Sequence, residues 1–334
     1  MLWLQFILCA AVIIGSASGL SKYGDVIAEK TGLGRAWVGV ILIAGATSLP
    51  ELASGISAVA WLQAPNLAAG AILGSNLFNL VLIAIMDLAY QPGSILANVQ
   101  EGHLLSAGLG ILMLGIVVLA ILLGGSISQI GFWGLSCFSF LLLLAYGLGA
   151  RMIAQFEQKR SAEVFEKEAQ VGNYAQISTR KAVTLFVASA LIVIVAGAWL
   201  AYLGDQIAAT TGLSSSFVGN LFLAVSTSLP EIAASLAAIR LGAIDMAIGN
   251  VLGSNLFNLT LLAVYDLVDG KANFWSSLTT ANAFAAVITM LMTGIVILSI
   301  VYRASPKTPY RISWDGLSLS ALYLGAIGLL YWLG

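Results

Sequence analysis

The sequence predicts an all-α integral membrane protein with ten transmembrane helices, built as two inverted repeats of five helices each. Three observations lead to this prediction. The composition is strongly apolar, ten apolar runs divide the chain, and two long segments of the first half recur in the second half. Together they place nearly the whole chain in a lipid bilayer.

The composition by itself requires contact with lipid. Of the 334 residues, 60% are hydrophobic and only 9% are charged, and the mean hydropathy is +0.98. Soluble domains carry about 25% charged residues, so the few charges here cannot cover a water-facing surface of this length. The two cysteines, Cys9 and Cys137, both lie in apolar runs, where we expect them to pack as small side chains rather than form a disulfide.

Apolar runs of membrane-spanning length are separated by charges, prolines or polar clusters. A helix needs about 20 apolar residues to cross a bilayer. Residues 151–182, between the fifth and sixth runs, hold six of the 14 Lys and Arg residues and are predicted to form a cytoplasmic connector. The ten predicted spans are residues 2–20, 36–61, 66–90, 103–124, 127–150, 183–203, 216–239, 243–267, 276–302 and 313–333.

Two blocks of sequence occur twice, once in each half. Residues 39–60 align with 219–240 without a gap at nine identities in 22 positions, and residues 70–88 align with 249–267 at 13 identities in 19. Residues 1–150 and 183–334 are therefore predicted to be two copies of one five-helix unit, with repeated motifs over 39–88 and 219–267. Because five is odd, the second copy must cross the membrane upside down relative to the first.

The distribution of basic residues supports the same topology. If the N-terminus is outside, 13 of the 14 Lys and Arg residues fall in inner loops, and Lys271 alone lies outside. Short cytoplasmic loops are enriched in Lys and Arg. We therefore expect a multi-pass protein of the plasma (inner) membrane, with the N-terminus outside and the connector cytoplasmic.

Only two acidic residues, Glu51 and Glu231, stand well inside apolar spans. They occupy equivalent positions of the two repeats, each at the end of a Thr-Ser-Leu-Pro-Glu stretch. An ionised carboxylate at the centre of a bilayer costs about 2.5–3.5 kcal/mol on insertion scales, and the predicted membrane core holds no Lys or Arg to pair with these two. A functional role is therefore expected for both.

The proline before each glutamate predicts a broken helix at the site. Proline has no N–H and clashes with the carbonyl four residues earlier, so Pro50 and Pro230 should each free a backbone oxygen. Hard cations such as Ca²⁺ and Na⁺ prefer oxygen ligands, whereas softer transition metals favour His or Cys. The additional oxygen donors predicted here are the carbonyls of Ala46 and Ser226 and the hydroxyls of Thr47, Ser48, Thr227 and Ser228.

The second repeated block adds four polar side chains. Ser75 and Asn79, like Ser254 and Asn258, are spaced i, i+4, so each pair lies on one face of its helix. These residues are candidates to line an ion site. Hydrogen bonding between helices, unrelated to any substrate, stays open as an alternative role.

The remaining repeated or ionisable residues are expected to be structural. Gly70 and Gly74, with Gly249 and Gly253 in the second copy, have the G-x-x-x-G spacing that allows close backbone packing. Asp87 and Asp266 lie at matching helix ends, where an interfacial position is expected. His103 is the only histidine and falls at a predicted helix end.

With both motif copies in view, the chain resembles the Ca²⁺/cation antiporter superfamily, specifically the sodium/calcium exchanger-like membrane proteins of prokaryotes. The resemblance rests on two motifs of the form G-T-S-L-P-E followed by G-S-N-x-x-N or G-S-N-x-x-D, and it covers nearly the whole chain. It implies a central divalent-cation site made by Glu51, Glu231, Thr47 and Thr227. It implies flanking ligands from Ser48, Ser228, Ser75, Ser254, Asn79 and Asn258 and from the carbonyls of Ala44 and Ala224.

Two departures from the pattern of that superfamily occur, at three positions. Ala46 and Ser226 replace the glycine that opens the first motif, and Asn258 stands where well-studied Na⁺/Ca²⁺ exchangers carry Asp. The second change removes one formal negative charge. Coupling to Na⁺ and coupling to H⁺ therefore both stay open.

The sequence thus predicts a secondary transporter and not an enzyme. It would exchange Ca²⁺, or a similar divalent cation, for Na⁺ or H⁺ by alternating access, with Ca²⁺ as substrate and without an organic cofactor. A monovalent cation/proton antiporter on the same fold is the first alternative, and an intramembrane hydrolase with paired acids is the second. The expected partners are the lipid bilayer and small inorganic cations, with no nucleic acid and no obligate protein partner.

Overall fold

Proline and glycine mark several of the helix boundaries. Helix α5 (Pro65–Ala89) begins at Pro65, and Pro50 is the second residue of α4 (Leu49–Ala60). Both prolines occupy the first turn of a helix, where the missing N–H leaves no bond unmade. Helix α8 (Thr179–Thr211) is capped by Gly212, whose φ of 73° is left-handed and favours glycine. The boundaries are therefore encoded locally, while the packing of these helices is not.

The computed structural model describes residues 1–31, 48–90, 93–127, 131–132, 135–164, 177–240, 244–270, 274–303 and 312–333. Apart from a hairpin of two strands with two residues each, the regular elements of this described part are helices. The long helices are α1 (Leu2–Thr31), α4 (Leu49–Ala60), α5 (Pro65–Ala89), α6 (His103–Ile127), α7 (Cys137–Val164), α8 (Thr179–Thr211), α11 (Leu229–Arg240), α12 (Ile244–Asp269), α14 (Thr280–Tyr302) and α15 (Trp314–Leu333). The short elements are η2 (Leu96–Asn98), β1 (Gly131–Phe132), β2 (Leu135–Ser136), α9 (Ser215–Val218), the π-helical η3 (Gly219–Leu223), α10 (Ala224–Thr227) and α13 (Phe274–Ser277).

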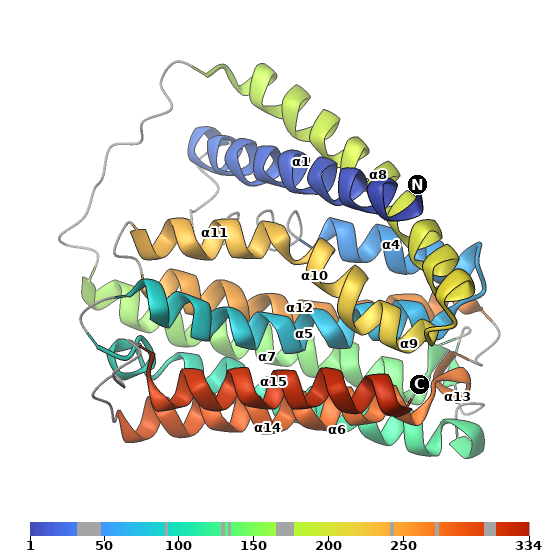
Figure 1. Ribbon diagram of the computed structural model, residues 1–334. Coiled ribbons are helices and arrows are strands. Elements are labelled where there is room, and N and C mark those ends of the chain that lie inside the picture. The colour runs from blue at the N-terminus through green and yellow to red at the C-terminus, as the bar shows by residue number, and fades with distance from the viewer. Residues whose placement is uncertain are drawn as a thin grey trace.

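The helices lie roughly side by side in layers (Figure 1). Helices α1 and α8 pack together at one edge, and α4 packs on α8. Helices α4 and α11 occupy the next layer, over the central pair α5 and α12, and α6, α7, α14 and α15 complete the other side (Figure 1). This arrangement places the two Pro-Glu helices against the central pair.

Among the residues that the structure describes, seven helices are long and apolar enough to span a membrane, and an eighth span is obtained if the bent pair Ser215–Thr227 and Leu229–Arg240 counts as one. These correspond to eight of the ten predicted spans. The predicted span 2–20 lies on α1, whose apolar stretch Leu2–Ser16 is shorter, and span 36–61 is represented by α4 alone because residues 32–47 lie outside the described part of the chain. The chain is a multi-span helical membrane protein, and the number ten stays a prediction.

The predicted start of the fifth span is wrong. The span expected at 127–150 begins at Cys137, because α6 continues to Ile127 and the β1–β2 hairpin pairs Gly131 with Ser136 before α7 starts. Glycine and polar residues in 124–136 interrupt the apolar pattern there and favour a turn over a continuous helix. Helix α7 then runs on to Val164, so the first part of the predicted connector is helical.

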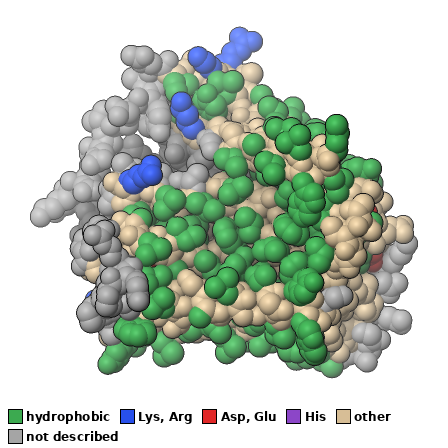
Figure 2. Space-filling view, viewed as in Figure 1, with side chains coloured by type: hydrophobic (Ala, Val, Ile, Leu, Met, Phe, Trp, Pro, Cys, Tyr) green, Lys and Arg blue, Asp and Glu red, His purple; other side chains and the backbone are tan. Residues whose placement is uncertain are grey.

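Burial separates the central helices from those that face lipid. In α5 and α12, 83% and 72% of the spanning window is buried, compared with 22% in α7, α8 and α15. Hydrophobic side chains spread across the face in Figure 2, while the Lys and Arg side chains on that face lie toward the side where α8 begins and α11 ends. The polar chemistry is therefore enclosed by α5 and α12 and the helices packed on them.

Close backbone packing joins α5 to the π-helical segment η3. A Cβ on Gly74 would overlap the backbone of Asn220, and a Cβ on Gly70 would lie 2.7 Å from the Ser216 carbonyl oxygen. Gly219 in turn faces the backbone of Leu67 on α5. The packing role expected for Gly70 and Gly74 is confirmed, because no larger residue fits there. For Gly253 the same expectation is wrong, because among the described residues no atom of another helix lies within 4 Å of a Cβ placed there.

Candidate cation site

The two Pro-Glu motifs adopt the same local backbone. Ser48 has φ −90° and ψ 6° immediately before α4, and Ser228 has φ −86° and ψ 3° immediately before α11. In the second motif, the helices on either side of Ser228 are bent by 43°. The helix break expected at Pro230 is therefore present, and it places Glu231 in the first turn of a new helix.

Both glutamates are buried next to a helix N-terminus. Glu51 and Glu231 are each 1% exposed, and each is the third residue of its helix, α4 or α11. The N-terminus of a helix carries a partial positive charge that stabilises a nearby carboxylate. The Pro-Glu motifs therefore provide a favourable local field for two acids that lipid would otherwise disfavour.

The two acids lie close enough to affect each other. The charge of Glu231 acts on Glu51 by repulsion, and Thr227 lies beside the Glu51 carboxyl group. The Thr227 hydroxyl bonds to the Leu223 carbonyl oxygen at 3.0 Å, and neither carboxylate oxygen of Glu51 forms a well-directed hydrogen bond within the described structure. The tertiary structure thus brings together the two acids that the sequence separates by 180 positions.

The central helices α5 and α12 supply the remaining polar side chains. Ser75 on α5 lies 3.5 Å from the Thr227 hydroxyl and 3.4 Å from the Ala224 carbonyl oxygen, hydroxyl to acceptor. The Ala224 oxygen also accepts the Ser228 N–H at 3.0 Å. Ser75, Thr227 and Ala224 therefore gather at the break, and the Ala224 carbonyl is already engaged by protein donors.

Asn79 and Asn258 are held by a pair of asparagines that sequence reasoning did not single out. Asn79 Nδ2 donates to Asn255 Oδ1 at 3.0 Å, and Asn258 Nδ2 donates to Asn76 Oδ1 at 3.1 Å. Asn76 and Asn255 stand at equivalent places in both Gly-Ser-Asn-Leu-Phe-Asn copies. Their repetition in both copies is the sequence signal that points to them. The i, i+4 spacing instead predicts ligands on the neighbouring face of each helix.

Several of these buried side chains carry oxygen atoms without a hydrogen-bond partner in the described structure. Leaving such a buried oxygen without a hydrogen bond costs about 1–3 kcal/mol. A group of them therefore indicates a site for a ligand that contacts these oxygens. We call this group the unpaired oxygen set. It consists of Ser48 Oγ, Glu51 Oε1 and Oε2, Asn79 Oδ1, Ser228 Oγ, Ser254 Oγ and Asn258 Oδ1.

The chemistry of this set suits a hard cation. All its members are oxygen atoms, from carboxylate, amide and hydroxyl groups, as Ca²⁺ and Na⁺ prefer. Within the described residues, no three His, Cys, Asp or Glu side chains gather at one place, so the site combines two acids with neutral oxygens. Thr47 and the Ala44 and Ala46 carbonyls, which the sequence also predicts here, lie outside the described residues.

A further contact reaches Glu51 from α12. The hydroxyl of Tyr265, a fully buried residue, donates to the Glu51 backbone oxygen at 2.8 Å. A Cβ on Gly55 would overlap the Tyr265 ring, so glycine at that position makes room for it. The second block carries Tyr265 where the first has Met86, and this difference between the copies was the only sequence signal.

Asp87 and Asp266 anchor helix starts. Asp87 Oδ2 accepts the N–H of Ser313, just before α15, at 2.7 Å, and Asp266 Oδ2 accepts the N–H of Ser136, just before α7, at 2.8 Å. Both aspartates are buried, at 1% and 0% exposed. The Ile95 N–H also donates to Asp87, and the Ser139 hydroxyl also donates to Asp266, so both carboxylates have a structural role, and the expected interfacial position stays a prediction.

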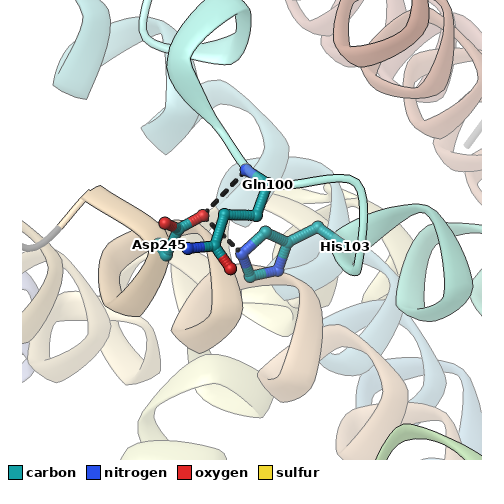
Figure 3. Close-up of polar contacts among 3 residues, drawn as sticks. All are labelled: Gln100, His103 and Asp245. Carbon is teal, nitrogen blue, oxygen red and sulfur yellow. Dashed lines mark hydrogen bonds and ion pairs between the residues drawn. The ribbon is translucent and has the colours of Figure 1, made fainter. Parts of the chain in front are cut away.

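His103 lies at the start of α6 and is not a member of the unpaired oxygen set. Its Nε2 is 3.2 Å from Asp245 Oδ1, which also accepts the Gln100 N–H at 2.9 Å (Figure 3). Asp245 begins α12, so this contact ties the α6 start to the α12 start. The predicted position of His103 at a helix end is confirmed.

Comparison with known proteins gives a consistent result along the whole chain. The family described as "Sodium/calcium exchanger protein" matches residues 1–151 and 181–332. The inner membrane protein YrbG of Escherichia coli K12 is 25% identical over 325 residues, covering 96% of this chain and 94% of that protein. The sodium/calcium exchanger MaX1 of Methanosarcina acetivorans is 23% identical over 346 residues, covering 93% of each protein.

Solved structures share the fold. The H⁺/Ca²⁺ exchanger CAX matches with a TM-score of 0.73 at 14% identity, covering 98% of this chain and 81% of that one. The sodium-calcium exchanger NCX_Mj, soaked with Na⁺ and Sr²⁺, matches with a TM-score of 0.58 at 23% identity, covering 98% and 99%. At these identities the likeness establishes the fold.

Proposed function

This chain belongs to the sodium/calcium exchanger protein family, within the Ca²⁺/cation antiporters, and we propose that it exchanges Ca²⁺, or a similar divalent cation, for Na⁺ or H⁺ by alternating access. Members of this group are secondary transporters rather than enzymes. The family therefore favours a transporter over the hydrolase alternative.

The observation that carries the proposal is the unpaired oxygen set. Its oxygen atoms come from α4, α5 and α12 and from the break before α11, so both halves of the chain contribute. Each of these atoms would regain a favourable contact from a bound cation. Glu51 and Glu231 would be the charged ligands, with Ser48, Ser228, Ser75, Ser254, Asn79 and Asn258 and with Thr47, Thr227 and the Ala44 and Ala224 carbonyls around them.

The charge of the site explains why exchange would be favoured over leak. Two carboxylates held about 4 Å apart repel by about 4 kcal/mol at an effective dielectric constant near 20. The site therefore needs about two positive charges, which one Ca²⁺, two Na⁺ or two protons supply. Because these ions compete for the same two carboxylates, loading one releases the other.

The neutral side chain of Asn258 favours coupling with only two compensating charges. Asn79 and Asn258 both contribute amide oxygens, so Glu51 and Glu231 are the only acids among the proposed ligands. The same argument keeps the monovalent cation/proton antiporter as the second candidate function. Ca²⁺ dependence distinguishes the two candidates.

We further propose ten membrane crossings in two inverted repeats, with the N-terminus outside and residues 151–182 cytoplasmic. Matched contacts support the two-fold relation: the Asp87–Ser313 contact of the first block has its counterpart in Asp266–Ser136 of the second. The excess of Lys and Arg in the predicted inner loops supports the orientation. Labelling of single cysteines introduced at Lys22 and Lys271, with a membrane-impermeant maleimide on intact cells and a cysteine-free background, tests it.

The function is tested by ⁴⁵Ca²⁺ uptake into proteoliposomes, with Na⁺ and pH gradients imposed separately. We expect uptake driven by one of these gradients and at least a tenfold loss in Glu51→Gln and Glu231→Gln. Glu101→Gln is the matched control, since Glu101 is exposed and pairs with Arg303 at 3.0 Å, where ion pairs contribute about 0–1 kcal/mol. Wild-type protein without Ca²⁺ uptake, or full uptake in Glu51→Gln, contradicts the proposal.

A further inference from the structure

The crossing of α5 and α12 is made by two asparagines that bond reciprocally. Asn76 Nδ2 donates to the Asn255 backbone oxygen at 3.2 Å, and Asn255 Nδ2 donates to the Asn76 backbone oxygen, also at 3.2 Å. Both side chains are buried, at 0% and 7% exposed. Each amide thus reaches across to the backbone of the opposite helix.

These bonds fix which way each amide points. A backbone carbonyl can only accept a hydrogen bond, so Asn76 and Asn255 must turn their NH₂ groups toward it. Their Oδ1 atoms then face the other way and need donors. The donors are the NH₂ groups of Asn258, at 3.1 Å from Asn76 Oδ1, and of Asn79, at 3.0 Å from Asn255 Oδ1.

The consequence is a defined orientation of the two candidate ligands. Because the NH₂ groups of Asn79 and Asn258 are committed, their Oδ1 atoms point elsewhere, and both are buried oxygens without a partner in the described structure. A flipped amide would present NH₂ hydrogens, which repel a cation. The orientation of each ligand is therefore set by an asparagine on the opposite helix, and not by its own neighbour three positions away.

We propose that Asn76 and Asn255 are positioning residues, each of which turns the amide oxygen of the asparagine on the opposite helix, Asn258 or Asn79, toward the transported cation. This inference rests on the proposed function. Neither Asn76 nor Asn255 needs to touch the ion. Both also line a small cavity of about 10 Å³ with Ser106 and Thr293, which has room for about one water molecule.

The proposal predicts a pattern of energetic coupling that crosses between the two halves. Removing the partner that orients a metal ligand lowers metal affinity about 10–100-fold. Asn76→Ala should therefore raise KM for Ca²⁺ about tenfold, as should Asn258→Ala. The double variant Asn76→Ala/Asn258→Ala should raise KM little further, because the two changes remove the same interaction.

The matched control is the pair on one helix that does not bond. Asn76→Ala/Asn79→Ala should raise KM by the product of the single effects, about a hundredfold, since independent sites are additive in free energy. In the mirror-image cycle, Asn255 should couple to Asn79 and not to Asn258. Asn250→Ala, which removes a 3.1 Å bond to Ser235 on α11, should leave KM within about twofold.

The experiment measures initial rates of ⁴⁵Ca²⁺ uptake against Ca²⁺ concentration, with thermal melting in detergent as a check of folding. A purely structural role would lower the melting temperature and the active fraction without the crossed coupling. Equal coupling within and between helices, or an unchanged KM in Asn76→Ala, overturns the inference.

Asn76→Asp covers the case in which the alanine variant does not fold. It still accepts the Asn258 amide but loses the NH₂ that donates to the Asn255 backbone oxygen, so KM should rise less than in Asn76→Ala, and a rise to the value expected for alanine would contradict the proposal. If wild-type protein takes up no Ca²⁺, the proposed function fails and this inference falls with it. If wild type is active and the crossed coupling is absent, the inference alone fails.

Discussion

The Tyr265 hydroxyl donates a 2.8 Å hydrogen bond to the backbone oxygen of Glu51. This bond joins α12, in the second half of the chain, to the first turn of the helix that carries a candidate ligand from the first half. A side chain from one repeat therefore supports the backbone of the acid in the other.

Tyr265→Phe should weaken that support without removing the acid. A typical hydrogen bond contributes about 0.5–1.5 kcal/mol to stability, so we expect a lower melting temperature in detergent and a KM for Ca²⁺ raised a few-fold. Tyr323→Phe on α15 is the control, because that ring is partly exposed on an outer helix. Identical melting and KM in Tyr265→Phe and wild type would show that the bond has no role.

Gly74→Ala should be strongly destabilising, because its Cβ would overlap the Asn220 backbone in η3. Overpacking of this kind costs about 1–3 kcal/mol. Gly115→Ala on α6 is the matched control: among the described residues, no atom of another helix lies within 4 Å of its Cβ position, and alanine is favoured over glycine in a helix by about 1 kcal/mol. Thermal melting should separate the two variants in opposite directions, and equal melting temperatures would refute the close packing.

Asp87→Asn and Asp266→Asn should lower stability while leaving Ca²⁺ affinity unchanged in the folded fraction. Each carboxylate accepts a backbone N–H at the start of an outer helix, and hydrogen bonds to charged groups contribute about 1.5–3 kcal/mol. Melting temperature and KM for ⁴⁵Ca²⁺ uptake, measured on the same preparations, check both parts. A KM raised tenfold with unchanged melting would instead assign these acids to transport.

Asn258→Asp should increase the dependence of uptake on Na⁺ or H⁺. The substitution adds a third acid to the proposed ligands, so a third positive charge is needed for neutrality. An ionised carboxylate at this position also lacks the NH₂ that donates to Asn76 Oδ1 in the wild type, which places two oxygens face to face. Uptake at stepped Na⁺ gradients and fixed pH, and then at stepped pH without Na⁺, measures the change, and profiles identical to wild type would contradict the charge argument.

The sequence predicts the acids of the candidate site well, for a physical reason. Glu51 and Glu231 stand in apolar spans without a predicted basic partner. Because an ionised group in lipid is energetically costly, such a residue is a candidate for a functional role. The structure buries both and places them close enough to interact. The start of the fifth span is predicted less well, because the glycine and polar residues in 124–136 stand between apolar residues, and hydropathy averaged over the length of a span does not resolve them.

Helical periodicity does not predict the role of Asn76 and Asn255. Helical spacing identifies which residues share a face, as it does for Ser75 with Asn79. It does not show which residue of another helix that face will meet. The reciprocal bonds between Asn76 and Asn255 exist only because α5 and α12 cross at those residues.

The sequence by itself determines that this protein is embedded in a lipid bilayer, that its two halves are related in sequence, and that two acids lie in its apolar spans. These properties follow from composition, repetition and the energetic penalty for charge in an apolar solvent, and none of them depends on how the helices pack. Only the tertiary structure decides that the charge of Glu231 acts on Glu51, and that Asn79 and Asn258 are oriented from the opposite half. Those contacts join residues more than 170 positions apart, and helix packing alone selects which of them form.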